Sequence, residues 1–400
     1  MKITNVHKLY ASNFLTGLVF WYGIEKLFMQ SIGINAVGVG TITAILIVFL
    51  VLFDIPSGLL ADKWSRKGML TISALSLAAC SFILGSSTGL MMYTVGILFY
   101  GLYIVATSGT YGAIMYDTLH EEDRAASYSK VQGKAYGLFL VGAGVGNVAG
   151  GFLAHHFSYS FSYYLTIISC LLNVLVILTI HEPMFHKVLD KQRFLRQLGA
   201  ASLTIAKLKL LRALTVVMTL LSVAELFKLD FGQLYMFRYI TAPQAIGILW
   251  AVYAFAMAFG SVIAHRFRAR LHILVIFASV PYVLMSFIDN AFSLVLFMIQ
   301  VIAAAALINQ IETRIQENTK SSVRTSVLSV VSTIGRIVTI PASFLLGWLI
   351  RDYNALWAVR FIALVLVAML LYWLWAKRRI PQANKPEVAK EDAAIAPALP

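Results

Sequence analysis

The hydrophobic positions of this chain fall into long runs that are separated by short polar intervals. A bilayer hydrocarbon core about 30 Å thick is spanned by about 20 apolar residues in an α-helix. Twelve segments of the sequence approach or exceed that length. In chain order they are 10–32, 36–60, 69–87, 91–119, 130–154, 159–180, 213–238, 243–264, 271–288, 291–317, 322–350 and 354–376.

The polar intervals divide these runs into two groups of six. Lipid offers no hydrogen-bond partners, so only helices and closed barrels can cross it, and runs of this length are too long for barrel strands. We therefore predict an all-α membrane protein with twelve transmembrane helices in two pseudo-symmetric six-helix bundles. The predicted parts are the bundles 1–181 and 213–377, a basic cytoplasmic connecting segment 182–212, and a disordered cytoplasmic tail 378–400.

Composition and charge support this topology. The chain is 60% hydrophobic and only 12% charged, whereas roughly a quarter of the residues in soluble domains are charged. Its formal charge of +14 could suggest nucleic-acid binding, but most of its 32 Lys and Arg residues fall on one side of the predicted topology. That bias orients membrane proteins with the basic side in the cytoplasm. We predict a multi-pass protein of the inner (plasma) membrane with both termini cytoplasmic and no nucleic-acid partner.

The polar hairpin between the second and third runs contains a spaced motif. Its residues read Asp54-Ile-Pro-Ser-Gly58, followed by a G-x-x-x-D-x-x-S-R-K spacing that starts at Gly58. This spacing closely resembles the signature loop between helices two and three of the major facilitator superfamily. The lead-in resembles that of a bacterial branch of this superfamily that is rich in exporters. Ser65 stands where the family usually has glycine. The resemblance implies the major facilitator fold, a transport function and a gating motif made of Asp54, Gly58, Asp62, Arg66 and Lys67.

The end of the fourth run adds a partner for this loop. Tyr116-Asp117-Thr-Leu119 resembles the Tyr-Asp-x-Leu end of helix four in the same branch. There the aspartate faces the arginine of the signature loop, which implies a pair between Asp117 and Arg66 here. An ordinary charged helix end is the alternative. No basic residue occurs between Ser81 and Leu119, so a proton relay through a helix-four arginine is excluded.

The fifth run contains closely spaced small residues. The stretch Gly142-Ala-Gly-Val-Gly-Asn-Val-Ala-Gly-Gly151 resembles the antiporter motif G-x-x-x-G-P-x-x-G-G, with Asn147 in place of proline. Glycines three or four residues apart let a neighbouring helix backbone approach closely. We predict a hinge or a tight helix contact here, and generic small-residue packing is the alternative. The motif residues are Gly142, Gly146, Asn147, Gly150 and Gly151.

Several charged residues fall inside predicted spans, where ionisable groups are costly and are therefore functional hypotheses. A shift of 203 residues aligns the two halves weakly and lays Glu25 over Lys228. In the superfamily, helices one and seven line the central cavity. We therefore predict that proton coupling or substrate binding involves these charges, with Glu25 and Glu225 first. The candidates are Glu25, Lys26, Glu225, Lys228, Asp230 and Arg336.

The sequence leaves alternatives open for these charges. Adjacent residues on a helix point about 100° apart, so Glu25 and Lys26 would not both face the centre of a cavity, and one could snorkel outward. Lys228 and Asp230 could lie near the outer interface. A buried carboxylate with a shifted pKa could exchange protons, whereas one held by Lys or Arg would act as a structural lock.

These patterns favour a secondary active transporter. The first hypothesis is proton-coupled export of a small amphipathic molecule by alternating access, because the loop, the modified antiporter motif and the intramembrane acids all agree with it. Proton-coupled uptake of a small polar solute is the alternative, and it would predict a more polar cavity. A lipid scramblase or a membrane enzyme on a related scaffold is less favoured.

Other chemistry finds little support in the sequence. No clustered catalytic constellation occurs, so we do not predict an enzyme, and no G-x-x-x-x-G-K-[ST] motif for direct ATP use is present. Cys80 and Cys170 lie in apolar runs and are expected to be packing residues. We expect no cofactor and no metal. The predicted partners of this monomeric protein are a small-molecule substrate, protons and the lipid bilayer.

Overall fold

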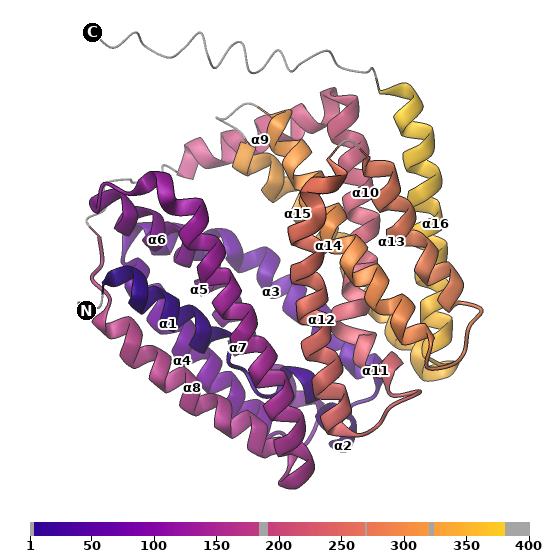
Figure 1. The fold of residues 1–400 in the computed structure, drawn as a ribbon, viewed down its shortest axis with the longest axis horizontal. Coiled ribbons are helices and arrows are strands. Elements are labelled where there is room, and N and C mark those ends of the chain that lie inside the picture. Colours follow the sequence, from indigo (N-terminus) through magenta and orange to yellow (C-terminus); the bar gives the residue numbers. More distant parts are fainter. Residues whose placement is uncertain (1–3, 184–190, 269, 320–323, 381–400) are drawn as a thin grey trace. The chain divides into compact units, whose positions relative to one another are not determined.

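The described part of the protein is helical. The computed structural model describes residues 4–183, 191–268, 270–319 and 324–380, and no strand occurs among them (Figure 1). In these residues, ten helical segments are long and apolar enough to cross a bilayer. The two remaining apolar runs correspond to an interrupted first helix and to α13 (Leu271–Met285), which has 15 residues. The predicted all-α fold class agrees with this architecture.

The chain forms two compact units. The first comprises Met1–Leu189, Lys228–Phe255 and Ser343–Ala355, and the second comprises Asp190–Phe227, Ala256–Ala342 and Leu356–Pro400. Parts of helices seven, eight and eleven thus group with the first six helices, which the order of the chain alone does not predict. We describe each unit separately.

The first unit contains the helices of the first half of the chain. Asn35 begins the second of these transmembrane helices by accepting a hydrogen bond from Gly38 N at 3.0 Å, and Ser158 caps the sixth in the same way. Such caps satisfy the amide groups that a helix start leaves unpaired. The elements are α1 (Asn5–Gly17), η1 (Tyr22–Ile24), α2 (Glu25–Ser31), α3 (Ala36–Lys63), α4 (Arg66–Gly85), α5 (Leu90–Thr107), α6 (Thr110–Glu121), η2 (Ala125–Ser127), α7 (Tyr128–His156) and α8 (Tyr159–Thr179).

A buried polar cluster joins α1, α6 and α8. Ser12 Oγ donates to Asn173 Oδ1 at 2.6 Å, and Asn173 Nδ2 donates to Thr16 Oγ1 at 2.9 Å. The Tyr111 hydroxyl lies 2.6 Å from Ser12 Oγ and 2.9 Å from Thr16 Oγ1. An apolar core that includes Leu9, Ile114 and Ile177 packs around the same helices. Because unpaired polar groups are costly in this environment, the cluster fixes the three helices to one another.

In the described residues, three of the transmembrane helices are interrupted. Helix one loses its regular turn between α1 and η1, and helix four breaks before α6 at Gly109, whose φ of 70° favours glycine. Helix seven passes through η3 (Phe227–Phe231), a π-helical turn, into α11 (Gly232–Met236). Non-helical backbone inside a membrane needs hydrogen-bond partners from the protein. In helix one, Ser169 Oγ donates to Leu18 O at 2.8 Å, and Phe20 N donates to Thr166 Oγ1 at 3.1 Å.

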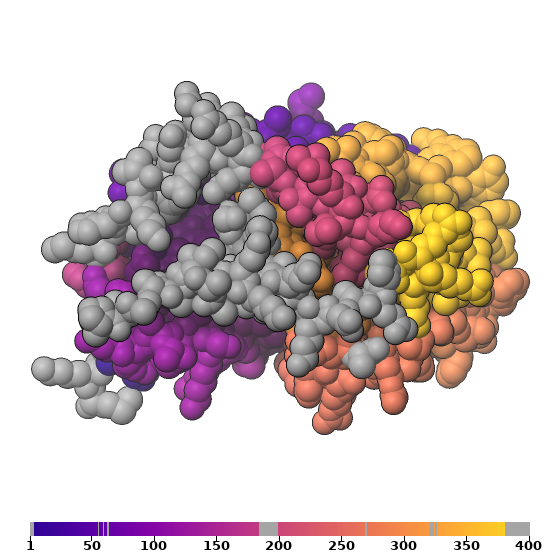
Figure 2. Space-filling model, turned by 90° about the horizontal axis from the view of Figure 1, so that it is seen from above, coloured from indigo at the N-terminus to yellow at the C-terminus, as the bar shows by residue number. Residues whose placement is uncertain are grey.

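The second unit contains most of the later helices. The predicted connecting segment 182–212 includes a helix, α9, and its residues 184–190 lie outside the described part. Figure 2 shows the second half of α9 and the end of α16 at the surface of this unit, where Lys207 and Lys377 are exposed. The predicted tail lies outside the described part beyond Ile380. The elements are α9 (Lys191–Lys207), α10 (Lys209–Leu226), α12 (Pro243–Ile263, shared with the first unit), η4 (Ala264–Phe267), α13, α14 (Ser293–Glu317), α15 (Arg324–Asp352, shared) and α16 (Ala355–Arg379).

Candidate functional site

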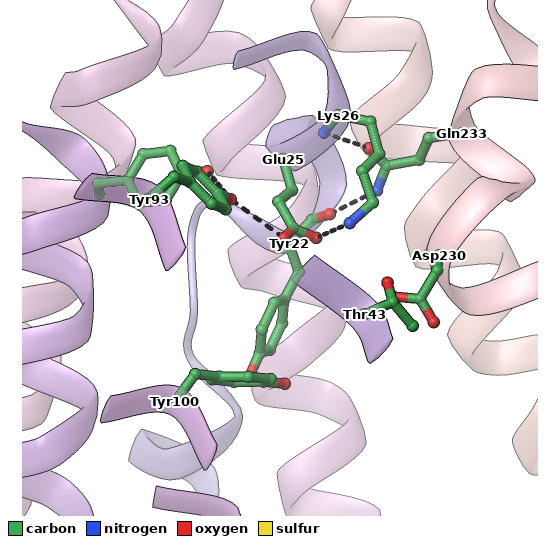
Figure 3. A network of polar contacts seen from close by, with 9 residues as sticks. Tyr22, Glu25, Lys26, Thr43, Tyr93, Tyr100, Asp230 and Gln233 are labelled. Carbon is green, nitrogen blue, oxygen red and sulfur yellow. Dashed lines mark hydrogen bonds and ion pairs between the residues drawn. The ribbon is translucent and has the colours of Figure 1, made fainter. Parts of the chain in front are cut away.

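Glu25 and Lys26 lie at the start of α2, directly after the break in helix one. Lys26 Nζ lies 2.8 Å from Glu25 Oε2, and the Tyr93 hydroxyl donates to Glu25 Oε1 at 3.1 Å (Figure 3). The Lys26 side chain is only 4% exposed and that of Glu25 15%. Although the two Cβ directions diverge, the long Lys26 side chain turns back to its neighbour and does not snorkel outward. Glu25 is therefore a carboxylate held by a cation.

Aromatic side chains surround this ion pair. Trp21 stacks on Tyr163 with ring centroids 5.1 Å apart, and its Nε1 donates to Ser81 Oγ at 3.0 Å. The Tyr100 hydroxyl donates to the Tyr22 hydroxyl at 3.2 Å. Trp21 and Tyr163 are fully buried and serve packing, whereas Tyr22 and Tyr100 are half-buried.

Asp230 lies in the π-helical turn of helix seven. Thr43 Oγ1, from α3, donates to Asp230 Oδ1 at 3.0 Å (Figure 3). Within the described residues Asp230 forms no ion pair. Lys228, two residues earlier, is 1% exposed and so is shielded from solvent. The structure thus brings Asp230 into the same region as Glu25 and Lys26. Glu25 is paired with a cation, whereas Asp230 accepts a hydrogen bond from a hydroxyl group.

Gln233, in α11, belongs to the same network, and sequence reasoning missed it. Its Nε2 donates to Tyr22 O at 2.6 Å, and its Oε1 accepts from Lys26 N at 3.0 Å. The side chain is 1% exposed. A buried amide three residues after an intramembrane aspartate was the available signal, but the sequence does not show that it faces helix one.

The other two predicted coupling residues belong to the second unit. Glu225 lies half-buried near the end of α10, and Arg336 lies half-buried within α15. The network of Figure 3 is formed within the first unit. The coupling roles of Glu225 and Arg336 stay predictions.

The predicted gating loop connects α3 to α4. Arg66 Nη1 donates to Asp117 Oδ2 at the end of α6, so the predicted pairing of these residues is confirmed. Lys67 Nζ donates to Leu178 O of α8 at 2.7 Å. Asp62 lies in the last turn of α3, and its side chain is outside the described part. The remaining two motif residues are Asp54, which is half-buried, and Gly58, whose Cα faces open space.

Glu182 completes the loop site, and sequence reasoning missed it too. Its Oε1 accepts from Arg66 N at 2.6 Å and from Lys67 N at 3.2 Å, and its Oε2 accepts from Ser65 Oγ at 2.7 Å. Glu182 therefore binds the free amides at the start of α4, where a negative charge is also favoured by the helix dipole. Ser65 caps the same helix by accepting from Gly68 N at 2.7 Å. Its φ of −171° is extended, so no glycine is needed there.

The glycines of α7 contact two different neighbours. A Cβ on Gly142, Gly146 or Gly150 would overlap the backbone carbonyl oxygens of Phe14, Val19 and Phe20, which lie in or beside the break of helix one. On another face of α7, a Cβ on Gly151 would lie 2.6 Å from Pro243 O of α12, and one on Gly247 of α12 would overlap Asn147 O. The predicted tight contact is present on both faces, and each requires the absence of a side chain.

Comparisons with known proteins identify the family. Residues 9–343 match the family described as Major Facilitator Superfamily. The chain belongs to the major facilitator superfamily. No curated protein sequence matches it. The family match, with the all-helical architecture, confirms the expected major facilitator fold of two pseudo-symmetric six-helix bundles.

Solved structures of this superfamily resemble the chain in fold. The nucleoside transporter NupG superposes with a TM-score of 0.74 at 15% identity, covering 94% of this chain and 99% of its own. A bacterial homolog of the human lysosomal transporter Spinster, inward-facing and occupied, gives 0.72 at 14% identity over 94% and 96%. A D-xylose-proton symporter gives 0.69 at 12% identity over 96% and 98%.

Proposed function

We propose that this protein is a secondary active transporter that exports a small amphipathic molecule by alternating access and is driven by protons. The observation that carries the proposal is that two carboxylates in one intramembrane network have different partners. Glu25 is paired with Lys26, whereas Asp230 accepts a hydrogen bond from the Thr43 hydroxyl and forms no ion pair in the described residues.

The two carboxylates differ in what protonation would cost. Protonating Glu25 would leave the buried Lys26 ammonium without its counter-ion, and an unpaired buried charge is strongly destabilising. Protonating Asp230 breaks no ion pair, and the neutral acid can still exchange a hydrogen bond with the Thr43 hydroxyl. Asp230 therefore replaces Glu25 and Glu225 as the favoured coupling residue. Glu25 takes the role of a structural lock.

The loop site supplies a gate in this proposal. Exposed basic residues gather at the helix ends of the second unit, at Lys207, Lys209, Arg212 and Lys377–Arg379, and a basic side faces the cytoplasm. The topology predicted from the sequence places both termini and the loop between α3 and α4 on the cytoplasmic side. Arg66, Asp117 and Glu182 then tie the cytoplasmic ends of α4, α6 and the segment after α8 together, and would stabilise the outward-facing state. Asp62→Asn is expected to impair transport while the protein still inserts.

Proton-coupled uptake of a polar solute is the second candidate. The half-buried residues Tyr22 and Tyr100 favour it, because their hydroxyl groups could bind a polar group. Among the structures of similar fold, one is a nucleoside transporter and one a D-xylose-proton symporter. Both candidates use the same coupling carboxylate, and they differ in direction and in the polarity of the substrate.

Transport in everted membrane vesicles tests the proposal. A panel of amphipathic and polar solutes is offered with and without an imposed pH gradient, and accumulation is compared between wild type, Asp230→Asn and Thr43→Ser, which keeps the hydroxyl donor. We expect gradient-dependent accumulation of an amphipathic solute in wild type and Thr43→Ser, and only downhill exchange in Asp230→Asn. Full gradient-driven accumulation by Asp230→Asn would refute the coupling role. Accumulation only in right-side-out vesicles would indicate uptake.

A further inference from the structure

In the break of helix one, a side chain takes the place of a backbone hydrogen bond. In an uninterrupted α-helix, Lys26 N–H would donate to Tyr22 C=O, because the two are four residues apart. Here each group meets the side-chain amide of Gln233. Lys26 N donates to Oε1 at 3.0 Å, and Nε2 donates to Tyr22 O at 2.6 Å (Figure 3). The primary amide of Gln233 therefore lies between the two groups as a peptide unit would.

The local backbone agrees with this insertion. Residues Tyr22–Ile24 form a 3₁₀ turn, and regular α-helix resumes only at Glu25. A side chain inserted into the i→i−4 ladder is a recognised cause of a helix break. The amide of Gln233 is 1% exposed, and both of its polar atoms are used, so the insertion is a satisfied arrangement.

A second buried glutamine, Gln300, does not bind backbone groups in this way. Gln300 in α14 is 0% exposed, and neither its Nε2 nor its Oε1 has a hydrogen-bond partner within the described residues. Burying an amide does not by itself lead it to a neighbouring backbone. The position of Gln233, three residues after Asp230 and directly after the π-helical turn, places its amide at the break of helix one.

We propose that Gln233 is a positioning residue that holds helix one open by taking the place of its Tyr22–Lys26 hydrogen bond. When Gln233 withdraws, Tyr22 C=O and Lys26 N–H can bond directly and the 3₁₀ turn can become α-helical. The two backbone groups are satisfied in both states, whereas the Gln233 amide loses both of its hydrogen bonds when it withdraws and must find new partners. Because the 3₁₀ turn has 3.0 residues per turn and the α-helix 3.6, closure rotates Glu25 and Lys26 relative to α1. Movement of helix seven at Asp230 thereby reaches helix one.

A distance measurement across helix one tests the inference without any substrate. Ala11 in α1 and Ser31 at the end of α2 are exposed, and each is replaced by Cys and spin-labelled in a background in which the buried Cys80 and Cys170 are changed to Ala. Pulsed electron–electron double resonance then gives the distribution of distances between the two spin labels.

The variants are Gln233→Met, which keeps the side-chain length without the amide, and Gln233→Glu, which keeps the acceptor for Lys26 N–H but not the donor to Tyr22 C=O. Gln300→Met controls for the loss of a buried amide. We expect Gln233→Met to shift the distance distribution relative to wild type, because residues 22–26 become α-helical, Gln233→Glu to shift it partly, and Gln300→Met to match wild type.

An unchanged distribution in the folded Gln233 variants would overturn the proposal, and so would an equal shift in Gln300→Met, because that would indicate general loosening. If Gln233→Met does not yield monodisperse protein, Gln233→Glu alone decides between the outcomes. Since no transport is measured, failure here is distinct from failure of the proposed function.

Discussion

The ion pair between Glu25 and Lys26 should behave as a stabilising unit that is broken by either single substitution. Both side chains are largely buried, at 15% and 4% exposed, and their charged atoms lie 2.8 Å apart. Removing one partner of a buried pair costs about 3–5 kcal/mol, because the remaining charge is left without compensation. We therefore expect Glu25→Gln and Lys26→Met each to lower the free energy of unfolding by about 3 kcal/mol or more.

The double variant should be much closer to wild type. Glu25→Gln with Lys26→Met leaves no buried charge, and the glutamine oxygen can still accept from the Tyr93 hydroxyl, which donates to Glu25 at 3.1 Å in the native protein. The remaining loss is the pair's own net contribution, which is small for a buried ion pair. Two single losses of about 3 kcal/mol or more and a small double loss give a coupling energy of about 5 kcal/mol or more in the double-mutant cycle.

The measurement is reversible unfolding in mixed detergent micelles, followed by tryptophan fluorescence, for wild type, both single variants and the double variant. Each protein is first checked for monodispersity. If the two single losses add to the double loss within about 0.5 kcal/mol, the residues are not coupled and the structural-lock role of Glu25 is wrong. In that case Glu25 returns as a candidate for proton coupling.

Two further predictions concern the loop site and the glycine contacts. Glu182→Ala should destabilise the start of α4 by about 1–2 kcal/mol, measured by the same unfolding assay. Glu122→Ala, which removes a partner of the exposed Arg124, should cost less than about 1 kcal/mol, and equal effects of the two substitutions would contradict the capping role. Gly150→Val should abolish the yield of monodisperse protein because its side chain would overlap Phe20 O, whereas Gly137→Val on the same helix meets open space and should be tolerated. Normal yields of Gly150→Val would show that α7 can move away from the break of helix one at no cost.

Much of the membrane architecture could be predicted from the order of hydrophobic and polar residues along the chain. Hydrophobic run length predicts spans because the bilayer imposes a minimum helix length and allows no unsatisfied backbone. The spacing of Arg66 and its resemblance to a known loop also predicted its partner Asp117, and the pair is present. The glycine spacing in α7 predicted a close helix contact, because a missing side chain permits close approach wherever the neighbour lies.

The candidate site was less predictable, because it depends on where side-chain ends meet. Glu25 and Lys26 diverge on a helical wheel, yet the flexible lysine stem joins their charged ends. Glu182 lies 116 residues along the chain from Arg66, at the start of the helix it caps, so no local pattern shows the contact.

The breaks in helices one and seven explain why Asp230 and Gln233 were ranked low or missed. A regular 3.6-residue periodicity assigns faces only to an uninterrupted helix. The π-helical turn at Phe227–Phe231 changes the direction of every side chain that follows it. The sequence by itself determined which segments cross the membrane and which charges lie among them, because burial in lipid acts on each segment separately. Tertiary structure decided which of those charges are paired, because pairing depends on contacts between distant segments.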